Sequence, residues 1–280
     1  MKSHCFPFRQ VPHTSKLFLD YLDFSPSVQP FYSRSPRFLE WAKEESGRIQ
    51  YPAERRSQIS AILERQNRNW GASATALENI DRLRSGACAI VTGQQVGLFG
   101  GPVFSIYKAL SAVKLAQEAR KLGIDAVPVF WLATEDHDFE EVNQVQLPGV
   151  DGKMETLVSG AQSRPDAPVG TISFGLEIEP SVTRVTELLG DSDVANLIRE
   201  CYRAGNNFGS AFAKLFTSLF ADYGVILLDG SDPDLDRVAA PLYSAALERA
   251  PEITQALLER DAKLQAAGYH QQVKVTSSST

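Results

Sequence analysis

The chain has 280 residues, enough for one large hydrophobic core or two smaller ones, and its three cysteines are too scattered for a disulfide framework or a cysteine zinc site. The formal net charge of -6 and the dispersed basic residues argue against nucleic acid as a partner. The N-terminal run has no apolar export segment, and no later apolar run reaches the length of a membrane span. We therefore expect a cytoplasmic protein that binds neither nucleic acid nor membrane.

The first third of the chain reads as surface helices. Residues 26–36 are rich in proline and serine, which is typical of an ordered loop. Spaced apolar positions then predict helices over 38–48, 52–63 and 74–83. We expect residues 1–85 to form a helical segment packed on a core that begins later.

That core begins with a βαβ pattern. The apolar run 87–91, bounded by Gly86 and Gly93, predicts a strand buried on both faces. Pro102 is tolerated at a helix start, and apolar positions recur at helical spacing as far as Gly123. A second strand follows over 127–132. Because the strands of a βαβ unit are parallel, both post-strand loops should lie at the same edge of the sheet.

After residue 143 the pattern changes. Glycines and short alternating runs such as METLVSG and VGTISFG predict a small β-rich insertion, which we place at about 147–205. Helices are expected to resume over 181–189, 194–203 and 210–222, before a buried strand at 225–229. Pro233 opens a further helix, and VKVT at 273–276 resembles a last strand.

The loop after the first strand is rich in glycine. Its spacing, GxxxGxxGG, matches neither the dinucleotide fingerprint nor the phosphate loop, so the glycines could cradle a nucleotide or simply make a tight turn. Two adjacent glutamine amides favour a ligand, because they are costly to bury without partners. The candidate binding residues here are Thr92, Gly93, Gln94, Gln95, Gly97, Gly100, Gly101 and Lys108, the last reaching back from the helix.

The loop after the second strand is crowded with acids. Five carboxylates and a histidine fall within seven residues of TEDHDFEEVN. Close carboxylates repel one another, so at least one should hold its proton more tightly unless a cation compensates. This crowding is the physical argument for function.

Three interpretations of Asp136, His137 and Asp138 remain open: general acid/base groups, contacts to a substrate's amine and hydroxyls, or ligands of a divalent metal. We expect no metal, since no second histidine or cysteine is spaced to complete a ligand set. Acidic residues also favour the first turn of a helix, the role that we assign to Glu140 and Glu141. Further candidate binding residues are Glu135, Asn143, Asp229, Tyr269 and His270.

Two motifs together carry a family resemblance. VTGQQVGLFGGPVFSIYKAL followed by PVFWLATEDHDFEEVN resembles the cysteine ligase of bacillithiol biosynthesis, the cysteine-adding enzyme. Other segments occur in the same order as in that family. Before the two motifs come Asp20-Tyr21-Leu22 and Phe31-Tyr32, and after them come FADYGVILLD and Gly268-Tyr269-His270. The resemblance therefore covers nearly the whole chain.

The resemblance implies an α/β fold with a Rossmann-like parallel sheet like that of class I aminoacyl-tRNA synthetases, with connecting-peptide insertions and a C-terminal coiled coil that makes a homodimer. This sequence reaches about half the family's length, without the later strands and the coiled coil. It also carries Gly100-Gly101-Pro102 where the synthetases have HxGH. An adenylating step therefore does not carry over from the synthetases.

By resemblance, the function is an amide-forming ligase step that adds L-cysteine to glucosaminyl-malate. ATP or another nucleotide would be a cofactor. The glycine loop would position a nucleotide or acyl anion, while Asp136, His137 and Asp138 would orient the amine and take up a proton. Two alternatives are a nucleotide-binding module without catalysis of its own, and a metal-dependent hydrolase that uses these same three residues.

Overall fold

The computed structural model describes residues 5–275. The chain divides into two compact units, of which Ile49–Val238 is the larger. Met1–Arg48 together with Ala239–Thr280 makes the smaller unit. The expected boundaries, at residue 85 and at about 147–205, stay predictions.

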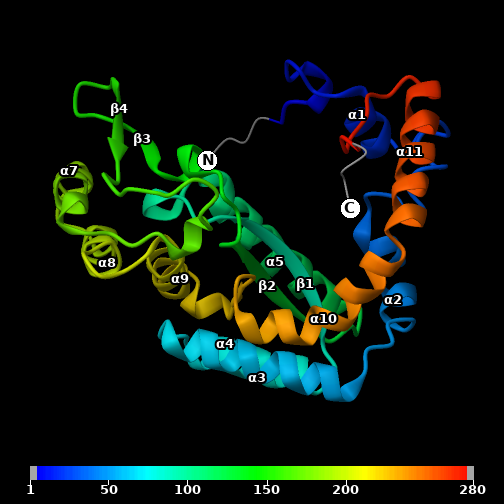
Figure 1. Ribbon diagram of the computed structural model, residues 1–280, viewed down its shortest axis with the longest axis horizontal. Coiled ribbons are helices and arrows are strands. Elements are labelled where there is room, and N and C mark those ends of the chain that lie inside the picture. The colour runs from blue at the N-terminus through cyan, green and yellow to red at the C-terminus, as the bar shows by residue number, and fades with distance from the viewer. Residues whose placement is uncertain (1–4, 276–280) are drawn as a thin grey trace. The chain divides into compact units, whose positions relative to one another are not determined.

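A parallel three-stranded sheet lies at the centre of the larger unit (Figure 1). Its strands are β1 (Cys88–Gln95), β2 (Ala126–Ala133) and β5 (Ile226–Asp229), in the order β1-β2-β5. Helix α5 (Val103–Lys121) joins β1 to β2, so the predicted βαβ unit and the α/β class are confirmed. Parallel strands end at one edge, so the three loops that follow them start there.

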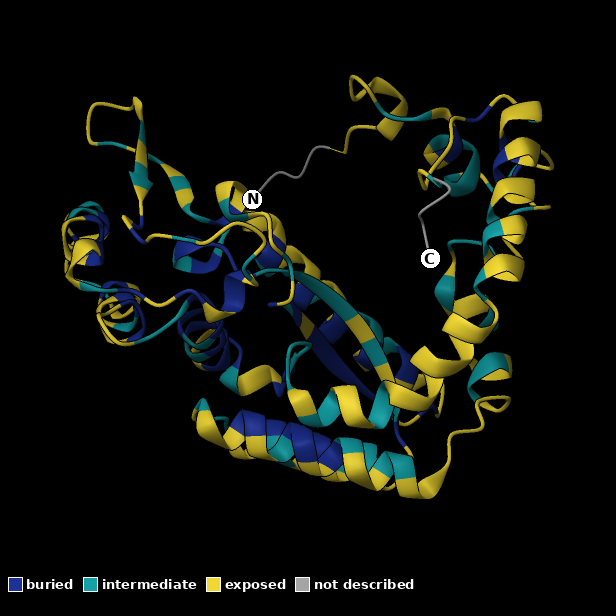
Figure 2. Ribbon diagram, viewed as in Figure 1, coloured by how far each residue is buried: buried dark blue, intermediate teal, exposed yellow. Residues whose placement is uncertain are grey.

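Two helices cover one face of the sheet, α3 (Ala53–Asn69) and α4 (Ala74–Arg84). Their buried positions appear dark blue among exposed yellow ones in Figure 2, as expected for helices with one face on a core. Val127 and Val129 of β2 contribute to the hydrophobic cluster that these helices share with the sheet. Ser73 caps the start of helix α4: its hydroxyl accepts a hydrogen bond from the third backbone N–H of the helix.

The opposite face of the sheet packs against α5 and α9 (Phe208–Leu219). Phe130 of β2 lies with its ring centroid 5.1 Å from that of Phe216, within the largest hydrophobic cluster. Helix α9 starts with a reciprocal capping pair, in which the side chains of Asn207 and Ser210 each accept the other's backbone N–H. The sheet is thus the middle layer of three.

The prediction that the first strand is buried on both faces is wrong. β1 stands at an edge of the three-stranded sheet, and its Val91 is 58% exposed. The apolar sequence of a parallel strand does not show whether the strand is central or at an edge of the sheet. The sequence gives the strand's own residues and not the strands or helices that will lie beside it.

The expected β-rich insertion contains one antiparallel hairpin, β3 (Gln144–Pro148) with β4 (Met154–Val158). The METLV part of the first alternating run is therefore a strand, as predicted. VGTISFG is not: it holds the 3-10 turn Val169–Thr171 and one isolated bridge at Ser173. The predicted helices follow as α7 (Glu179–Leu189), α8 (Asp193–Cys201) and α9. A one-turn helix, α6 (Phe139–Val142), precedes the hairpin.

The smaller unit is helical, with a core of Leu17, Val28, Leu264 and Tyr269. Helix α10 begins in the larger unit at Pro233, as predicted, and continues into the smaller one. The described residues of VKVT, 273–275, form no strand, and Thr276 lies outside the described residues. The helices are α1 (Lys16–Leu22), α2 (Phe38–Ser46), α10 (Pro233–Glu248) and α11 (Ala250–Ala266).

Within residues 5–275, the structure contains no helix with the length and apolar character needed to cross a bilayer.

Candidate functional site at the carboxyl edge of the sheet

The glycine-rich loop and the acidic loop meet at the carboxyl edge of the sheet. Gln95 ends β1 in register with Ala133, which ends β2. The Gln95 amide Nε2 donates a hydrogen bond to Asp136 Oδ2 at 2.7 Å. The loops that the sequence placed at one edge are therefore in direct contact through their side chains.

Gln95 also contacts Glu141. The same Nε2 donates to Glu141 Oε2 at 2.8 Å, so one amide bridges two carboxylates. The sequence assigned Glu141 only to the first turn of a helix, and this contact was missed. No local signal separates Glu141 from Glu140, because both lie in that turn; the direction of α6 decides which one faces Gln95.

Asp136 is held in its charged form. Partial burial acts to raise the pKa of this carboxyl, but the backbone N–H of Asp138 and the Gln95 amide outweigh it by donating hydrogen bonds to the carboxylate. The pKa of Asp136 consequently lies below its usual value. The expectation that crowding makes a carboxylate hold its proton more tightly therefore does not apply to Asp136.

His137 and Asp138 are exposed at the same edge. No hydrophobic side chains seal the imidazole, so it is accessible to a substrate. The catalytic roles of Asp136, His137 and Asp138 stay predictions.

The turn after β1 requires glycine. A Cβ on Gly97 would come within 2.8 Å of the Gly101 Cα, so two stretches of backbone approach too closely for a side chain. Gly100 and Gly101 both have positive φ, 93° and 69°, in a conformation that L-residues rarely adopt. The buried Tyr202 hydroxyl accepts from the Gly100 N–H at 3.0 Å and donates to the Gly97 carbonyl at 3.4 Å.

Helix α5 starts directly after this turn without a side-chain cap. Its first-turn residue Ser105 is fully buried, and the Ser105 hydroxyl has no hydrogen-bond partner. That oxygen lies 3.5 Å from the position of a Cβ on Gly101. An uncapped helix start beside glycine backbone is the arrangement that binds anions in many proteins.

Lys108 reaches back to the glycine loop, as expected. Its ammonium Nζ donates to Gln94 Oε1 at 2.6 Å and to the Gly93 carbonyl at 3.2 Å. A positive charge is therefore fixed beside the end of β1, although the lysine itself remains exposed.

A second polar group forms where β2 and β5 end. Asp229 accepts hydrogen bonds from the Thr134 hydroxyl and from the Ser231 hydroxyl and N–H. The predicted position of Asp229 at this edge is confirmed by the parallel pairing of β5 with β2. Next to it, Glu135 Oε1 accepts from the Trp131 indole Nε1 at 3.1 Å. Trp131 is not among the residues that the sequence patterns indicated.

The remaining candidates lie elsewhere. Thr92 lines a groove between β1 and α5. Asn143 accepts the Ser159 hydroxyl and backbone N–H, which ties the hairpin to the loop. Tyr269 and His270 belong to the smaller unit, where the Tyr269 hydroxyl contacts Asp20 and Ser27 at 2.9 Å. A role for either in the site stays a prediction.

Among residues 5–275, no three or more His, Cys, Asp or Glu side chains are arranged to hold a metal ion.

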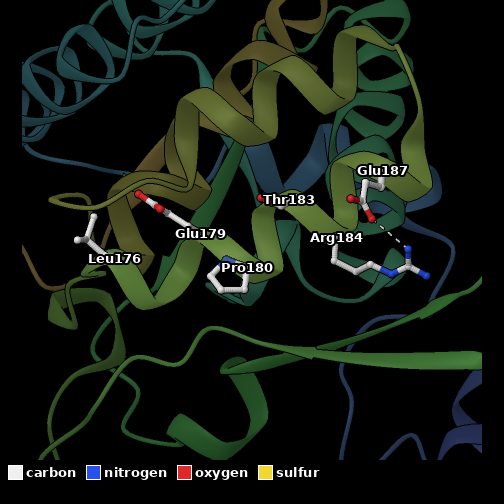
Figure 3. Close-up of a pocket in the computed structure, with 6 residues that line it drawn as sticks. All are labelled: Leu176, Glu179, Pro180, Thr183, Arg184 and Glu187. Atoms are coloured by element: carbon white, nitrogen blue, oxygen red, sulfur yellow. Dashed lines mark hydrogen bonds and ion pairs between the residues drawn. The ribbon is translucent and has the colours of Figure 1, made fainter.

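A different hollow lies along α7 and contains none of the candidate residues (Figure 3). The arginine that lines it is already paired: Arg184 donates to Glu187 at 3.1 Å and to Glu155 of β4 at 2.6 Å. We therefore place the candidate site at the sheet edge. The hollow is lined by Leu176, Glu179, Pro180, Thr183, Arg184 and Glu187.

The fold and this edge define a Rossmann-like α/β protein with a glycine turn and an acidic loop side by side. The family model described as bacillithiol biosynthesis BshC, N-terminal Rossmann-like domain, matches residues 1–280. The chain belongs to this family, and the resemblance and the fold expected from the sequence are confirmed.

Curated relatives of this chain carry the name of the same family. Proteins named "Putative cysteine ligase BshC" are 45% identical over 98% of this chain in Koribacter versatilis and 38% over 97% in Solibacter usitatus. The Geobacillus thermodenitrificans protein of the same name is 30% identical over 92% of the chain. The chain covers 52%, 51% and 49% of these relatives, so it spans about half of their length.

Proposed function

We propose that this chain takes part in bacillithiol biosynthesis, as the Rossmann-like part of a ligase that joins the carboxyl of L-cysteine to the amine of glucosaminyl-malate. The observation that carries the proposal is the Gln95–Asp136 hydrogen bond of 2.7 Å, which brings the two family motifs into contact. The relatives are named as cysteine ligases, which supports the reaction class. A cytoplasmic location and a homodimer of the longer protein belong to the same proposal.

The acidic loop suits an amine substrate. Asp136 keeps its negative charge to low pH and can attract an ammonium group toward the site. The amine must be neutral to attack, so a base has to accept its proton as the amide bond forms and the activating group leaves the cysteine carboxyl. The imidazole of His137 is exposed, and we assign it the role of accepting that proton.

The glycine turn offers polar groups to a nucleotide. The unpartnered, buried Ser105 hydroxyl and the uncapped start of α5 are polar groups that an anion could satisfy. Gly97, Gly100, Gly101, Ser105 and Lys108 would hold the phosphates. When bound, the nucleotide would activate the cysteine carboxyl. The residues of the glycine turn would position its phosphates, and the acidic loop lies beside that turn.

The test uses the gene that encodes this chain in a cell that makes bacillithiol. Gln95→Ala and His137→Ala should each lower cellular bacillithiol by about tenfold or more, because each removes a group from the reacting site. Thr183→Ala, on the α7 hollow, is the matched control and should leave the thiol content unchanged. Thiol content is measured by mass spectrometry, with protein level checked by immunoblot.

Full thiol content in both site variants, at normal protein level, would contradict the proposed site.

A second candidate is a nucleotide-binding module without catalysis, which the start of α5 favours. Calorimetry with ATP and ADP, set against turnover of cysteine with glucosaminyl-malate, separates the two. Binding without turnover supports the module. The third possibility, a metal-dependent hydrolase, predicts hydrolysis that a chelator abolishes.

A further inference from the structure

Tyr202 lies in the segment between β4 and α9, and its hydroxyl bonds to the glycine turn. It directly follows α8, is 1% exposed, and is 102 positions away from Gly100 in the sequence. The hydroxyl accepts from the Gly100 N–H at 3.0 Å and donates to the Gly97 carbonyl at 3.4 Å. Burial raises the pKa of Tyr202, so the hydroxyl keeps the proton that it donates.

The turn that Tyr202 contacts is strained. Phe99, Gly100 and Gly101 have positive φ values in succession, 51°, 93° and 69°. For Phe99 this left-handed conformation costs free energy, because its Cβ crowds the backbone. A strained conformation of this kind persists only where the surrounding structure holds it. The turn therefore needs support from outside its own residues.

The tyrosine supplies that support in two ways. Its ring packs edge-to-face on the ring of Phe99, with the centroids 4.9 Å apart. Its hydroxyl adds to a hydrogen bond that the turn already makes, from the Gly100 N–H to the Gly97 carbonyl at 3.2 Å. Because these two backbone groups already pair with each other, the hydroxyl holds the shape of the turn rather than satisfying an orphaned group.

The same segment between β4 and α9 also holds the acidic loop. The Val169 N–H donates to the Asp136 carbonyl at 2.7 Å. The Gly170 N–H donates to the Thr134 carbonyl at 2.9 Å. A Cβ on Gly170 would come within 2.4 Å of the Thr134 Cβ, so the two stretches of chain lie in close contact. One segment is thus bonded to both loops of the candidate site.

The two points of attachment are joined to each other through Phe174. This residue follows the 3-10 turn Val169–Thr171, and its ring centroid lies 5.9 Å from that of Tyr202. Its N–H donates to the Asn206 carbonyl at 2.8 Å, and its carbonyl accepts from the Gly205 N–H at 2.9 Å. Tyr202 and the turn that holds the acidic loop therefore belong to one packed unit.

We propose that Tyr202 is a positioning residue for the ligase reaction, which fixes the glycine turn so that Gln95 reaches Asp136. Gln95 lies two residues before Gly97, and its side chain bridges the two loops. A turn released from Tyr202 would shift relative to the acidic loop and weaken that bridge. The inference rests on the proposed function, because that function gives the bridge its purpose.

The test variant is Tyr202→Phe, which removes the hydroxyl and keeps the ring. It should fold, because the backbone groups of the turn keep their own hydrogen bond. Ser181→Ala is the matched control: the buried Ser181 hydroxyl donates to the Val158 carbonyl at 2.6 Å instead of to the turn. Each variant loses one buried hydroxyl of the same segment, so a general loss of stability affects both.

Two local measurements separate positioning from stability. Hydrogen exchange at the amides of residues 97–101, followed by NMR, should be about tenfold faster in Tyr202→Phe and unchanged in Ser181→Ala. The pKa of Asp136, followed through its carboxyl ¹³C shift, should rise toward 3.8 in Tyr202→Phe only, because the Gln95 amide supports the charged carboxylate less well. A loss of overall stability alone would speed exchange throughout the protein.

The functional measurement is cellular bacillithiol, determined by mass spectrometry at matched protein level. Tyr202→Phe should lower the thiol content by about fivefold or more, because a small displacement of reacting groups slows a reaction strongly. Ser181→Ala should leave the thiol content unchanged.

Parent-like exchange at residues 97–101, a parent-like pKa of Asp136, or a Tyr202→Phe variant that does not fold would each overturn the proposal. Normal thiol content in Tyr202→Phe would also overturn it, provided that Gln95→Ala lowers the thiol. Failure of the proposed function alone gives a different result: Gln95→Ala and His137→Ala make normal thiol, while the turn of Tyr202→Phe still exchanges faster. The two failures are therefore distinguishable.

Discussion

Gln95 organises the site because one amide nitrogen serves two carboxylates. Asp136 and Glu141 would otherwise repel each other across the sheet edge, and the donor between them offsets that repulsion. The amide oxygen of Gln95 lies 3.5 Å from the Gln94 amide nitrogen, and Gln94 in turn accepts from Lys108. The positive charge of the lysine is thus connected to the acids through two neutral amides.

The pKa of Asp136 tests this arrangement. Gln95→Leu removes a donor to the carboxylate and should raise the pKa of Asp136 toward the ordinary value of 3.8. A folded-state pKa below the unfolded one contributes stability above the unfolded pKa, and that contribution is lost as the pH falls through the folded pKa. The stability difference between parent and variant should therefore be present near neutral pH and shrink as the pH falls below about 4.

Carboxyl ¹³C chemical shifts followed by NMR titration measure this pKa directly. Glu141→Gln is the control, because it changes the other partner of Gln95 and leaves the donor to Asp136 in place. An unchanged or lower pKa in Gln95→Leu would show that the amide does not stabilise the charged carboxylate.

At the scale of elements, α3 completes an edge of the sheet. β5 is an edge strand that pairs with β2. On the other side of β5, the Asn67 side-chain amide donates a hydrogen bond to the Leu227 carbonyl at 2.7 Å and accepts one from the Leu227 N–H at 3.0 Å. Gln66 does the same for Asp229, at 3.3 and 3.1 Å. Two adjacent amide side chains of one helix thus replace a neighbouring strand.

This arrangement predicts a large effect from one amide. Asn67→Ala should lower the free energy of unfolding by roughly 2–4 kcal/mol, because two buried backbone groups of Leu227 lose their partners. The exposed Asn69 ends the same helix, so Asn69→Ala is the matched control and should change stability by less than about 0.5 kcal/mol. Urea unfolding followed by circular dichroism measures both. Similar values for the two variants would rule out the role of Asn67.

At the scale of the whole molecule, the larger unit has its own core. The buried clusters on both faces of the sheet are built from residues within Ile49–Val238. A unit with a complete core of this kind can fold by itself.

We therefore expect a fragment of residues 49–238 to unfold cooperatively in urea, with the helical circular dichroism of its α/β fold. A fragment of residues 49–222 lacks β5, including the buried Ile226 and Leu227, and should fail to show a cooperative transition. A non-cooperative transition in the longer fragment would mean that the smaller unit is required for folding.

Sequence patterns located most of the helices and strands, because apolar spacing is a local property. The start of α5 after Pro102 and its end before Gly123 followed from residue type alone. Contacts between residues far apart in the sequence were harder to predict. VGTISFG alternates like a strand, yet it forms a 3-10 turn and pairs with other backbone only at the isolated bridge between Ser173 and Asn207. A strand needs a longer stretch of neighbouring backbone, which the sequence pattern does not reveal.

The candidate site, too, could be predicted from the sequence only in part. Gln95 and Asp136 could be predicted to lie close together, since Gln95 ends one strand and Asp136 follows the next, and one helix joins these two parallel strands. Glu141 and Trp131 could not, because the orientation of a one-turn helix and the glycines flanking an indole depend on the packing of separate elements.

The amino-acid sequence by itself determined the βαβ unit, the common edge of the two loops and the family, because each depends on local order along the chain. Only the tertiary structure decided that β1 stands at an edge, that α3 closes β5 through Asn67, and that Trp131 stays uncovered. These depend on which surfaces meet between elements that are separated along the chain, as with Asn67 and Leu227, which are 160 positions apart.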